Sequence, residues 1–290
     1  MSMPSVSEDK GEQKMELWFT ERQTPDVGLT CRLTETLRFE RTKYQELAIH
    51  QTKQFGRMLI LDGTVQTTEF DEFFYHEMMA HPALFAHSDP RRVLIIGGGD
   101  GGVVREVVKH DSVESVELVE IDERVVAAGR EFFPTISCGL TDPRVKVIIG
   151  DGIEHVRSAE GAYDVVIVDS TDPVGPAVGL FAVEFYRAVN RALRAGGILV
   201  AQTESPLFNR DILSHAVRSI RQAFANTRLY LGPVPTYPSG YWSYTMGLKS
   251  DVDPAQIIGD KPCPFATKYY TPEIGRAAFA LPPFVRDLIS

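Results

Sequence analysis

The chain carries the stretch Val93-Leu94-Ile95-Ile96-Gly97-Gly98-Gly99-Asp100-Gly101-Gly102, in which four branched apolar residues pass directly into a run of glycines. The apolar residues predict a buried parallel strand, and the glycines predict a tight turn at which the backbone approaches a ligand before a helix begins. Gly97, Gly99 and Gly102 fit the spacing of the dinucleotide-binding fingerprint. Glu120 closes the next predicted strand, where a carboxylate can bind the hydroxyls of a ribose.

Asp100 distinguishes this turn from the usual fingerprint. The N-terminus of a helix favours an anionic ligand, but here the turn carries its own carboxylate. That carboxylate would repel a pyrophosphate and attract a cation. The turn therefore predicts a nucleoside ligand with a positively charged appendage rather than NAD.

The composition is that of an ordinary soluble globular protein. A chain of 290 residues is long enough to bury a full core in one large domain or two smaller ones. Its 43% hydrophobic and 24% charged residues are ordinary proportions for such a protein. No apolar run approaches the ~18 residues of a membrane span. The polar segment 1–14 lacks the apolar part of a signal peptide and is predicted to be a disordered tail.

Charge and cysteine content narrow the class further. A net charge of −9 argues against a nucleic-acid partner, which would require a basic face, and is compatible with a cationic substrate. The 3 cysteines are odd in number and widely separated, so they imply neither a disulfide framework nor a zinc site. We therefore expect a cytoplasmic protein.

The order of predicted elements indicates an α/β fold with a doubly wound, Rossmann-like sheet of the methyltransferase type and a small N-terminal β-domain. Short strands with tight turns are predicted for a domain at 15–70, which should pack on the next domain or on a second subunit. The catalytic domain is predicted at 71–290, and it begins with a helix from Asp71 to about Ala86. Strands and helices then alternate, whereas the segment after Lys249, with Pro254 and Gly259, is predicted to be a loop.

The expected strands of the second domain are Val93–Ile96, Ser115–Glu120, Val145–Ile149, Val165–Asp169 and Ile198–Gln202. The expected helices are Gly102–Lys109, Glu123–Phe132, Gly152–Arg157, Val183–Leu193 and Asp211–Ala225.

Acidic residues follow four of the predicted strands, and in this topology those strand ends meet in one crevice. They are Asp100, Glu120, Asp151 and the pair Asp169 and Asp172. A single acidic residue at a strand end commonly caps a helix or lies in solvent, but four in register favour a shared site. Glu120 suits a ribose diol and Asp151 suits the exocyclic amine of adenine, so together they indicate adenosine.

Asp169 and Asp172 flank a predicted turn closed by Pro173. Two carboxylates this close must differ in environment, share protons, or bind a dication, unless Asp172 only caps the turn. An alkylamine, with a pKa near ~10.4 by analogy with lysine, is protonated at pH 7 and must lose a proton before it can attack. A carboxylate pair could hold such an ammonium group and remove that proton.

Other residues are ambiguous on their own. The aromatic loop Pro235–Trp242 could wall a channel for an alkyl chain or could be ordinary surface packing, and Tyr75 and His76 are similarly open. His76 and His81 lie five positions apart, hence about 140° apart around a helix, so they should not share a metal ion. No metal site is expected.

Seven segments, taken in order, resemble the spermidine synthase family of polyamine aminopropyltransferases. The resemblance runs from about Glu16 to Lys249, with a weaker match in the C-terminal tail. The segments are Leu61–Glu69, Asp71–Met78, Gly97–Gly102, Val119–Asp122, Gly150–Gly152, Asp169–Pro176 and Pro235–Gly240.

The resemblance implies a reaction and a set of roles. Putrescine would attack decarboxylated S-adenosylmethionine, a co-substrate rather than a cofactor, to give spermidine, 5′-methylthioadenosine and a proton that Asp169 accepts. On the methylthioadenosine side the set includes Gly97 of the fingerprint and Ile121, an apolar neighbour for the purine. The full set on this side is Gln45, Gly97, Glu120, Ile121, Asp151, Gly152 and Pro176. Those implied on the polyamine side are Tyr75, His76, Asp100, Asp169, Ser170, Thr171, Asp172 and Tyr237.

Several points stay open at this stage. A methyltransferase would need a site for the methionine carboxylate, which Asp100 disfavours, and a regulatory polyamine-binding protein would not need both Asp169 and Asp172. A homodimer is expected, with a tetramer as the alternative. The acceptor could be putrescine, cadaverine, agmatine or spermidine.

Overall fold

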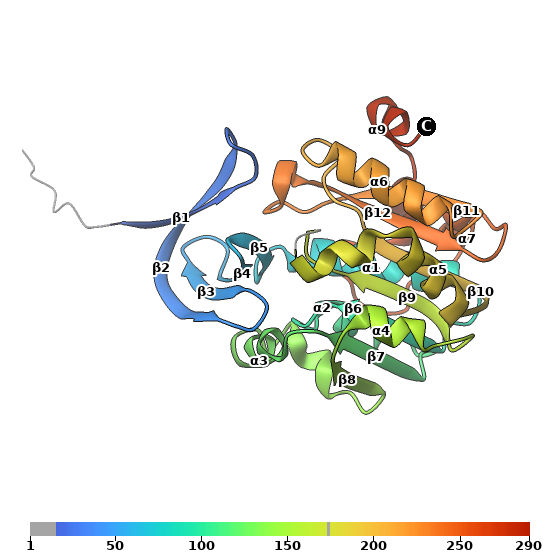
Figure 1. The fold of residues 1–290 in the computed structure, drawn as a ribbon, viewed down its shortest axis with the longest axis horizontal. Helices are drawn as coiled ribbons and strands as arrows, with labels where there is room; N and C mark the ends of the chain where they lie inside the picture. Colours follow the sequence, from blue (N-terminus) through green and yellow to red (C-terminus); the bar gives the residue numbers. More distant parts are fainter. Residues whose placement is uncertain (1–15, 173–174) are drawn as a thin grey trace, which may run out of the picture.

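The computed structural model describes residues 16–172 and 175–290, which form two β-sheets of different size (Figure 1). The predicted disordered tail at 1–14 lies outside the described residues, as does the turn residue Pro173. In Figure 1 the smaller sheet lies to one side of a larger sheet that is covered by helices.

The N-terminal sheet is an antiparallel meander of five strands in chain order. Its strands are β1 (Leu17–Arg22), β2 (Gly28–Arg41), β3 (Glu46–Thr52), β4 (Arg57–Leu61) and β5 (Thr64–Thr68). The turn between β4 and β5 contains Asp62 and Gly63, whose φ angles of 48° and 81° suit a two-residue hairpin turn. The prediction that the N-terminal part of the chain forms a small β-domain is confirmed.

The larger sheet has seven strands in the order β11-β12-β10-β9-β6-β7-β8. Their bounds are β6 (Arg92–Gly97), β7 (Ser115–Glu120), β8 (Val145–Ile149), β9 (Tyr163–Asp169), β10 (Leu193–Gln202), β11 (Asn226–Pro233) and β12 (Tyr241–Leu248). β10, β9, β6, β7 and β8 pair in parallel, whereas β12 and β11 are antiparallel. The five parallel strands are the predicted ones, and the α/β class is confirmed.

Helices cover both faces of this sheet because its central strands are apolar on both sides. In β6, Val93 and Ile95 pack in one core cluster, and Leu94 and Ile96 pack in another. The first cluster includes α1 (Glu72–Ala86) and α2 (Gly102–Val107), and the second includes α4 (Gly152–Arg157), α5 (Val183–Ala192) and α6 (Arg210–Arg221). Within the described part of the chain, no helix is long and apolar enough to span a membrane.

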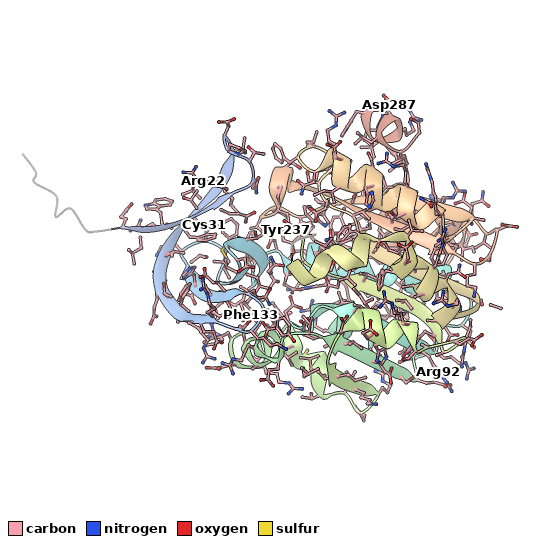
Figure 2. The ribbon with its side chains drawn as sticks, viewed as in Figure 1. Arg22, Cys31, Arg92, Phe133, Tyr237 and Asp287 are labelled. Atoms are coloured by element: carbon pink, nitrogen blue, oxygen red, sulfur yellow. The ribbon has the colours of Figure 1, made fainter. Side chains whose placement is uncertain are left out.

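The two sheets are joined through α3 (Glu123–Phe132) and the residue that follows it. Leu47 and Leu59 of the N-terminal sheet share an apolar cluster with Val125 of α3 and with Phe133. Figure 2 labels Phe133 at this junction. The N-terminal sheet is therefore held against the edge of the larger sheet at which β6, β7 and β9 end.

The C-terminal third differs from the prediction in two ways. The predicted loop that ends at Trp242 stops earlier, because Tyr241 and Trp242 begin β12, and neither β11 nor β12 was predicted. The segment after Lys249 was predicted to be a loop, which is wrong in three places, because prolines begin α7 (Pro254–Gly259), α8 (Pro272–Ala277) and α9 (Pro283–Leu288). Proline is favoured at the first position of a helix, where its missing N–H has no partner to lose. Short 3₁₀ turns lie at Ser137–Thr141, Gly175–Phe181 and Pro238–Gly240.

Candidate active site

One pocket lies at the carboxyl ends of the parallel strands, between the larger sheet and the N-terminal sheet. All but one of the predicted site residues line it. These are Gln45, Tyr75, His76, Gly97, Asp100, Glu120, Ile121, Asp151, Gly152, Asp169, Ser170, Thr171, Asp172 and Tyr237. The exception is Pro176, whose side chain is outside what the structure describes.

The glycines of the turn after β6 allow β9 to approach closely. Gly97 and Gly98 have φ angles of +79° and +69°, which favour glycine. A Cβ on Gly97 would lie 2.1 Å from the Asp169 carbonyl oxygen, and one on Gly98 would lie 2.5 Å from Asp169 Oδ2. The glycine run therefore sets the position of the Asp169 carboxylate.

Glu120 presents a fixed carboxylate at the end of β7. Its Oε2 accepts a hydrogen bond from the Gly99 N–H at 3.2 Å, and its Oε1 accepts one from the Asp122 N–H at 2.9 Å. Burial raises the pKa of Glu120 to about 7, although these two hydrogen bonds lower it. Gln45 reaches the same edge from the N-terminal sheet, and its Nε2 donates to Asp122 Oδ2 at 3.0 Å.

Asp151 has a structural role as well as a place in the pocket. Its Oδ1 accepts a hydrogen bond from the Ile153 N–H at 2.8 Å and so caps α4. The following residue must be small, because a Cβ on Gly152 would lie 2.3 Å from Ile96 Cγ2. The capping alternative is therefore realised, and the same side chain also faces the pocket.

Asp169 is partly buried and lies between Tyr75 and the glycine turn. The Tyr75 hydroxyl donates to Asp169 Oδ1 at 2.6 Å. Burial and the neighbouring Asp100 carboxylate together raise the pKa of Asp169 to about 6, although His76 and the Tyr75 hydrogen bond lower it. The carboxylate that acts on Asp169 is thus Asp100, rather than Asp172 as the sequence suggested.

Asp172 faces two acidic residues that the sequence did not single out. Glu204 is fully buried, and burial together with the neighbouring Asp172 carboxylate raises the pKa of Glu204 well above its ordinary value. Glu21 of β1 is also buried, and burial together with Asp172 raises its pKa to about 7. Glu204 lies two residues after the end of β10, a fifth strand end that could have been counted with the other four.

Aromatic side chains also line the pocket. The Tyr237 hydroxyl donates to the carbonyl oxygen of Gln66 at 2.5 Å, and its ring centroid lies 5.6 Å from that of Tyr75 and 4.8 Å from that of Trp242. Figure 2 labels Tyr237 between the N-terminal sheet and the larger sheet. The loop that carries Tyr237 is therefore part of the pocket wall. Trp242, which ends the aromatic loop considered as a possible channel wall, also lines the pocket, and so does Gln202, which was not predicted.

The two histidines of α1 have different direct partners, as their spacing predicts. His76 contacts Glu72 and Asp100, whereas His81 contacts Glu106 and His110. Over residues 16–172 and 175–290, no group of three or more His, Cys, Asp or Glu side chains is arranged to hold a metal ion.

The pocket combines the fixed Glu120 carboxylate, further carboxylates and aromatic rings in one lining. Glu120 can accept hydrogen bonds from two hydroxyls of a ribose. Asp100, Asp169 and Asp172 can hold an aliphatic amine, and the rings can cover its methylene groups. The arrangement thus suits a nucleoside bound beside a polyamine.

Comparisons with known proteins agree with this geometry. The spermine/spermidine synthase domain matches residues 72–255, and the spermidine synthase tetramerisation domain matches residues 17–69. A polyamine aminopropyltransferase of Moorella thermoacetica is 57% identical over 94% of this chain and 96% of its own, and one of Caldicellulosiruptor saccharolyticus is 55% identical over 95% and 99%. A crystal structure of spermidine synthase in complex with the transition state analogue AdoDATO superposes with a TM-score of 0.91 at 42% identity, covering 94% of each chain. This chain therefore belongs to the spermine/spermidine synthase family of aminopropyltransferases.

Proposed function

We propose that this enzyme transfers the aminopropyl group of decarboxylated S-adenosylmethionine to putrescine, giving spermidine and 5′-methylthioadenosine, with Asp169 as the proton acceptor. The observation that carries the proposal is the convergence of Asp100, Asp169 and Asp172 beside Glu120 in one pocket. Support also comes from the similar spermidine synthase whose complex holds a transition state analogue. The donor is a co-substrate, and we propose no resident cofactor and a cytoplasmic location.

The reaction is a nucleophilic displacement at carbon. The amine nitrogen forms a bond to the aminopropyl carbon next to the sulfonium, and the carbon–sulfur bond breaks with its electron pair going to sulfur. Sulfur becomes a neutral thioether in methylthioadenosine, so relief of its charge supplies driving force. The remaining tasks of the protein are to align the amine and to take its proton.

Asp169 is suited to the second task. With a pKa of about 6 it is a carboxylate at neutral pH, yet it is a stronger base than an ordinary aspartate. The Tyr75 hydroxyl occupies Oδ1 at 2.6 Å, which leaves Oδ2, next to Gly98, as the oxygen that can accept a proton.

The far end of the pocket supports a diamine acceptor. Asp172 lines the pocket, and the buried carboxyl groups of Glu21 and Glu204 lie next to it. A second ammonium group at this end would be paired with Asp172, while the attacking amine lies at Asp169. A monoamine of similar length would leave Asp172 without that partner.

An amine panel tests the proposal. The purified enzyme is assayed with decarboxylated S-adenosylmethionine and putrescine, cadaverine, agmatine, spermidine or butylamine, with methylthioadenosine release and product mass as readouts. We expect the highest kcat/KM with putrescine and at least ~10-fold less with butylamine, since a charge-assisted contact contributes about 1.5–3 kcal/mol. Release of S-adenosylhomocysteine from S-adenosylmethionine, without aminopropyl transfer, would instead indicate a methyltransferase.

The pKa of Asp169 predicts an acidic limit to turnover. Because its pKa is raised to about 6, the basic form is present above this pH and is lost as the pH falls through it. At saturating donor, kcat/KM for putrescine should fall about tenfold per pH unit below this value. A profile that stayed flat down to pH ~4.5 would contradict the assignment, because an ordinary aspartate pKa is ~3.9.

The N-terminal sheet is proposed to mediate self-association, because the family model that matches it is named for tetramerisation. Phe39 on β2 and Trp18 on β1 are 66% and 54% exposed in the single chain, which is unusual for side chains so apolar. Light scattering should give a mass that is a multiple of the 32.3 kDa chain, either a dimer or a tetramer. A monomer at all concentrations would refute this proposal and leave the catalytic one intact.

A further inference from the structure

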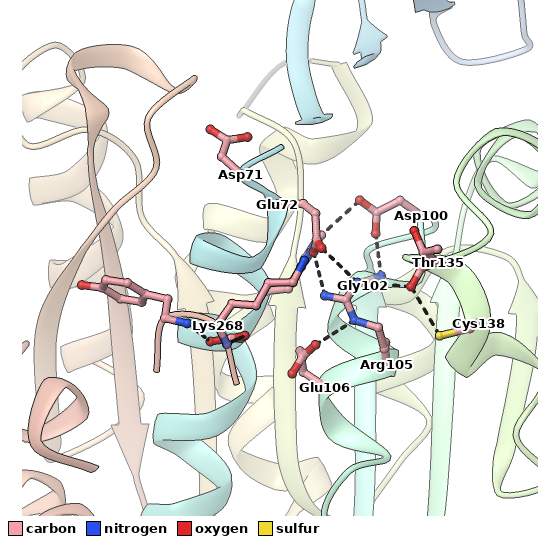
Figure 3. A network of polar contacts seen from close by, with 12 residues as sticks. Asp71, Glu72, Asp100, Gly102, Arg105, Glu106, Thr135, Cys138 and Lys268 are labelled. Carbon is pink, nitrogen blue, oxygen red and sulfur yellow. Dashed lines mark hydrogen bonds and ion pairs between the residues drawn. The ribbon is translucent and has the colours of Figure 1, made fainter. Parts of the chain in front are cut away.

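Two charged residues lie directly behind the pocket without lining it. Glu72, on the first turn of α1, and Arg105, on α2, form a buried bidentate ion pair, with Arg105 Nη1 3.0 Å from Glu72 Oε1 and Nη2 2.7 Å from Oε2. Arg105 is held from its other side by Glu106, whose Oε1 accepts from Nε at 2.7 Å. Figure 3 shows this network together with Asp100, which lines the pocket.

Glu72 is connected to the pocket through one imidazole ring. His76 Nδ1 lies 2.6 Å from Glu72 Oε2, and His76 Nε2 lies 3.4 Å from Asp100 Oδ2. Both ring nitrogens thus face carboxylate oxygens, which can only accept. A neutral imidazole has a single N–H and can satisfy one of them, whereas an imidazolium donates to both.

The ring cannot readily turn away. A Cβ placed on Gly102 would lie 2.2–2.4 Å from three atoms of the His76 ring, so the ring rests directly on the backbone of α2. Asp100 is held from its other side, because its Oδ1 accepts the Gly102 N–H at 2.8 Å. Imidazole and carboxylate are therefore fixed against the same turn of the backbone, and the charge of the ring decides whether their contact is attractive.

We propose that Glu72, clamped by Arg105, is a positioning residue that keeps His76 charged, so that His76 holds the Asp100 carboxylate in place for the aminopropyl ammonium of the donor. This inference rests on the proposed function for one point only, namely that the cation bound by Asp100 is the aminopropyl ammonium of the donor. The link between Glu72 and the ionisation of His76 stands independently of it.

The charges around His76 come from four elements. Glu72 and, through it, Arg105 act from α1 and α2, Asp100 acts from the turn after β6, and Asp169 acts from β9. Burial would lower the pKa of His76, but the carboxylates of Asp100 and Glu72 outweigh it and raise this pKa to about 10. Its proton is therefore retained below this pH and is lost only as the pH rises through it.

The neighbouring Tyr75 contributes no charge at neutral pH, because its own pKa is raised well above the ordinary value by burial and by Asp169. Burial would also raise the pKa of Glu72, but His76 and Arg105 lower it to about 2, so Glu72 is an anion throughout the working range. Removing the charge of Glu72 should consequently lower the pKa of His76.

Glu72→Gln tests the proposal, because glutamine keeps the size and one acceptor but removes the charge. The NMR signal of His76 is assigned as the one that is missing from the spectrum of His76→Gln. In the wild type this signal should show no titration between pH ~6 and ~9. In Glu72→Gln it should titrate within that range. KM for the donor should then rise at least ~10-fold between pH ~6 and ~8.5 relative to the wild type, with kcat at saturating donor changed less than ~threefold.

Glu77→Gln is the matched control. Glu77 is a buried carboxylate on the same helix, but its side chain accepts the N–H groups of Lys268, Tyr269 and Tyr270 rather than pairing with the His76 ring. This variant should lose stability and keep the wild-type pH dependence of donor KM. A change that is merely structural would move both variants alike.

Three results would overturn the proposal. They are a wild-type His76 that titrates near its ordinary pKa, a Glu72→Gln variant whose His76 stays charged, and a titrating His76 with unchanged donor KM. The wild-type measurement decides the first point even if Glu72→Gln fails to fold. If the wild type transfers no aminopropyl group at all, the proposed function fails, while the NMR titration still tests the link between Glu72 and His76.

Discussion

Replacing Asp169 with asparagine should lower kcat by at least ~10²-fold, which is the lower range for losing a positioned general base. Asparagine has the same shape, and its Oδ1 can still accept the Tyr75 hydroxyl that now lies 2.6 Å from the carboxylate. The amide cannot take a proton from the attacking amine. The loss should therefore appear in kcat measured at saturating donor and amine, and the acidic limit near pH 6 should disappear with it.

Folding should not suffer from this substitution. Because the pKa of Asp169 is raised above its unfolded value, its ionisation costs stability as the pH rises through about 6. A neutral asparagine avoids that cost, so the midpoint of thermal unfolding at pH 7 should be unchanged or higher. Affinity for methylthioadenosine should stay within ~threefold, because Glu120 rather than Asp169 is proposed to hold the ribose.

Asp164→Asn is the matched control for Asp169→Asn. Asp164 lies on the same strand, β9, and its Oδ2 accepts the N–H groups of Arg91 and Arg92 at 3.0 Å and 2.8 Å, away from the pocket. It should cost stability and leave kcat near the wild-type value. Near-normal turnover in Asp169→Asn would remove Asp169 from the role of proton acceptor.

The acidic residues at the strand ends are the part of the candidate site that the sequence predicts. A parallel sheet brings the carboxyl ends of its strands to one edge, so acidic residues at four such ends predict a cluster without any knowledge of packing. Asp100, Glu120, Asp151 and Asp169 accordingly line one pocket. The glycine run predicts the close approach of β9 in the same way, because its positive φ angles and missing side chains are properties of the residue type.

The residues that contact these acidic side chains from outside the pocket could not be predicted, because only tertiary packing brings them together. Glu21 comes from β1 of the other sheet, and Arg105 meets Glu72 across two helices that are separated by a strand. Glu204 has a φ angle of 72°, which a sequence without glycine at that position does not indicate. The prolines of the C-terminal third suggest a loop or a helix start equally well until packing selects between them.

Glu120→Gln should weaken the binding of methylthioadenosine by about 10–100-fold, since a hydrogen bond to a charged group contributes ~1.5–3 kcal/mol. Both carboxylate oxygens already accept backbone N–H groups, from Gly99 and Asp122. Glutamine must place its NH₂ group against one of these donors, so it loses that contact and one acceptor for the ribose. Titration calorimetry with methylthioadenosine measures the change directly, without a chemical step.

The same measurement has a pH signature. Because burial raises the pKa of Glu120 to about 7, the charged form that accepts the ribose hydroxyls is lost as the pH falls through this value. Wild-type affinity for methylthioadenosine should therefore weaken below about pH 7, and Glu120→Gln should bind weakly with no such dependence. This behaviour separates Glu120 from Asp169, whose ionisation should affect turnover and leave nucleoside affinity unchanged.

Glu117→Gln is the control on the same strand. Glu117 lies on β7, its Oε2 accepts the Tyr163 hydroxyl at 2.6 Å, and it does not line the pocket. Its substitution should leave methylthioadenosine affinity within ~threefold of the wild type, because no ribose contact is removed. If Glu120→Gln instead bound methylthioadenosine normally and lost turnover, Glu120 would belong with the chemistry of the amine. The division of the pocket into a nucleoside end and a polyamine end would then be wrong, because it depends on Glu120 acting only on the ribose.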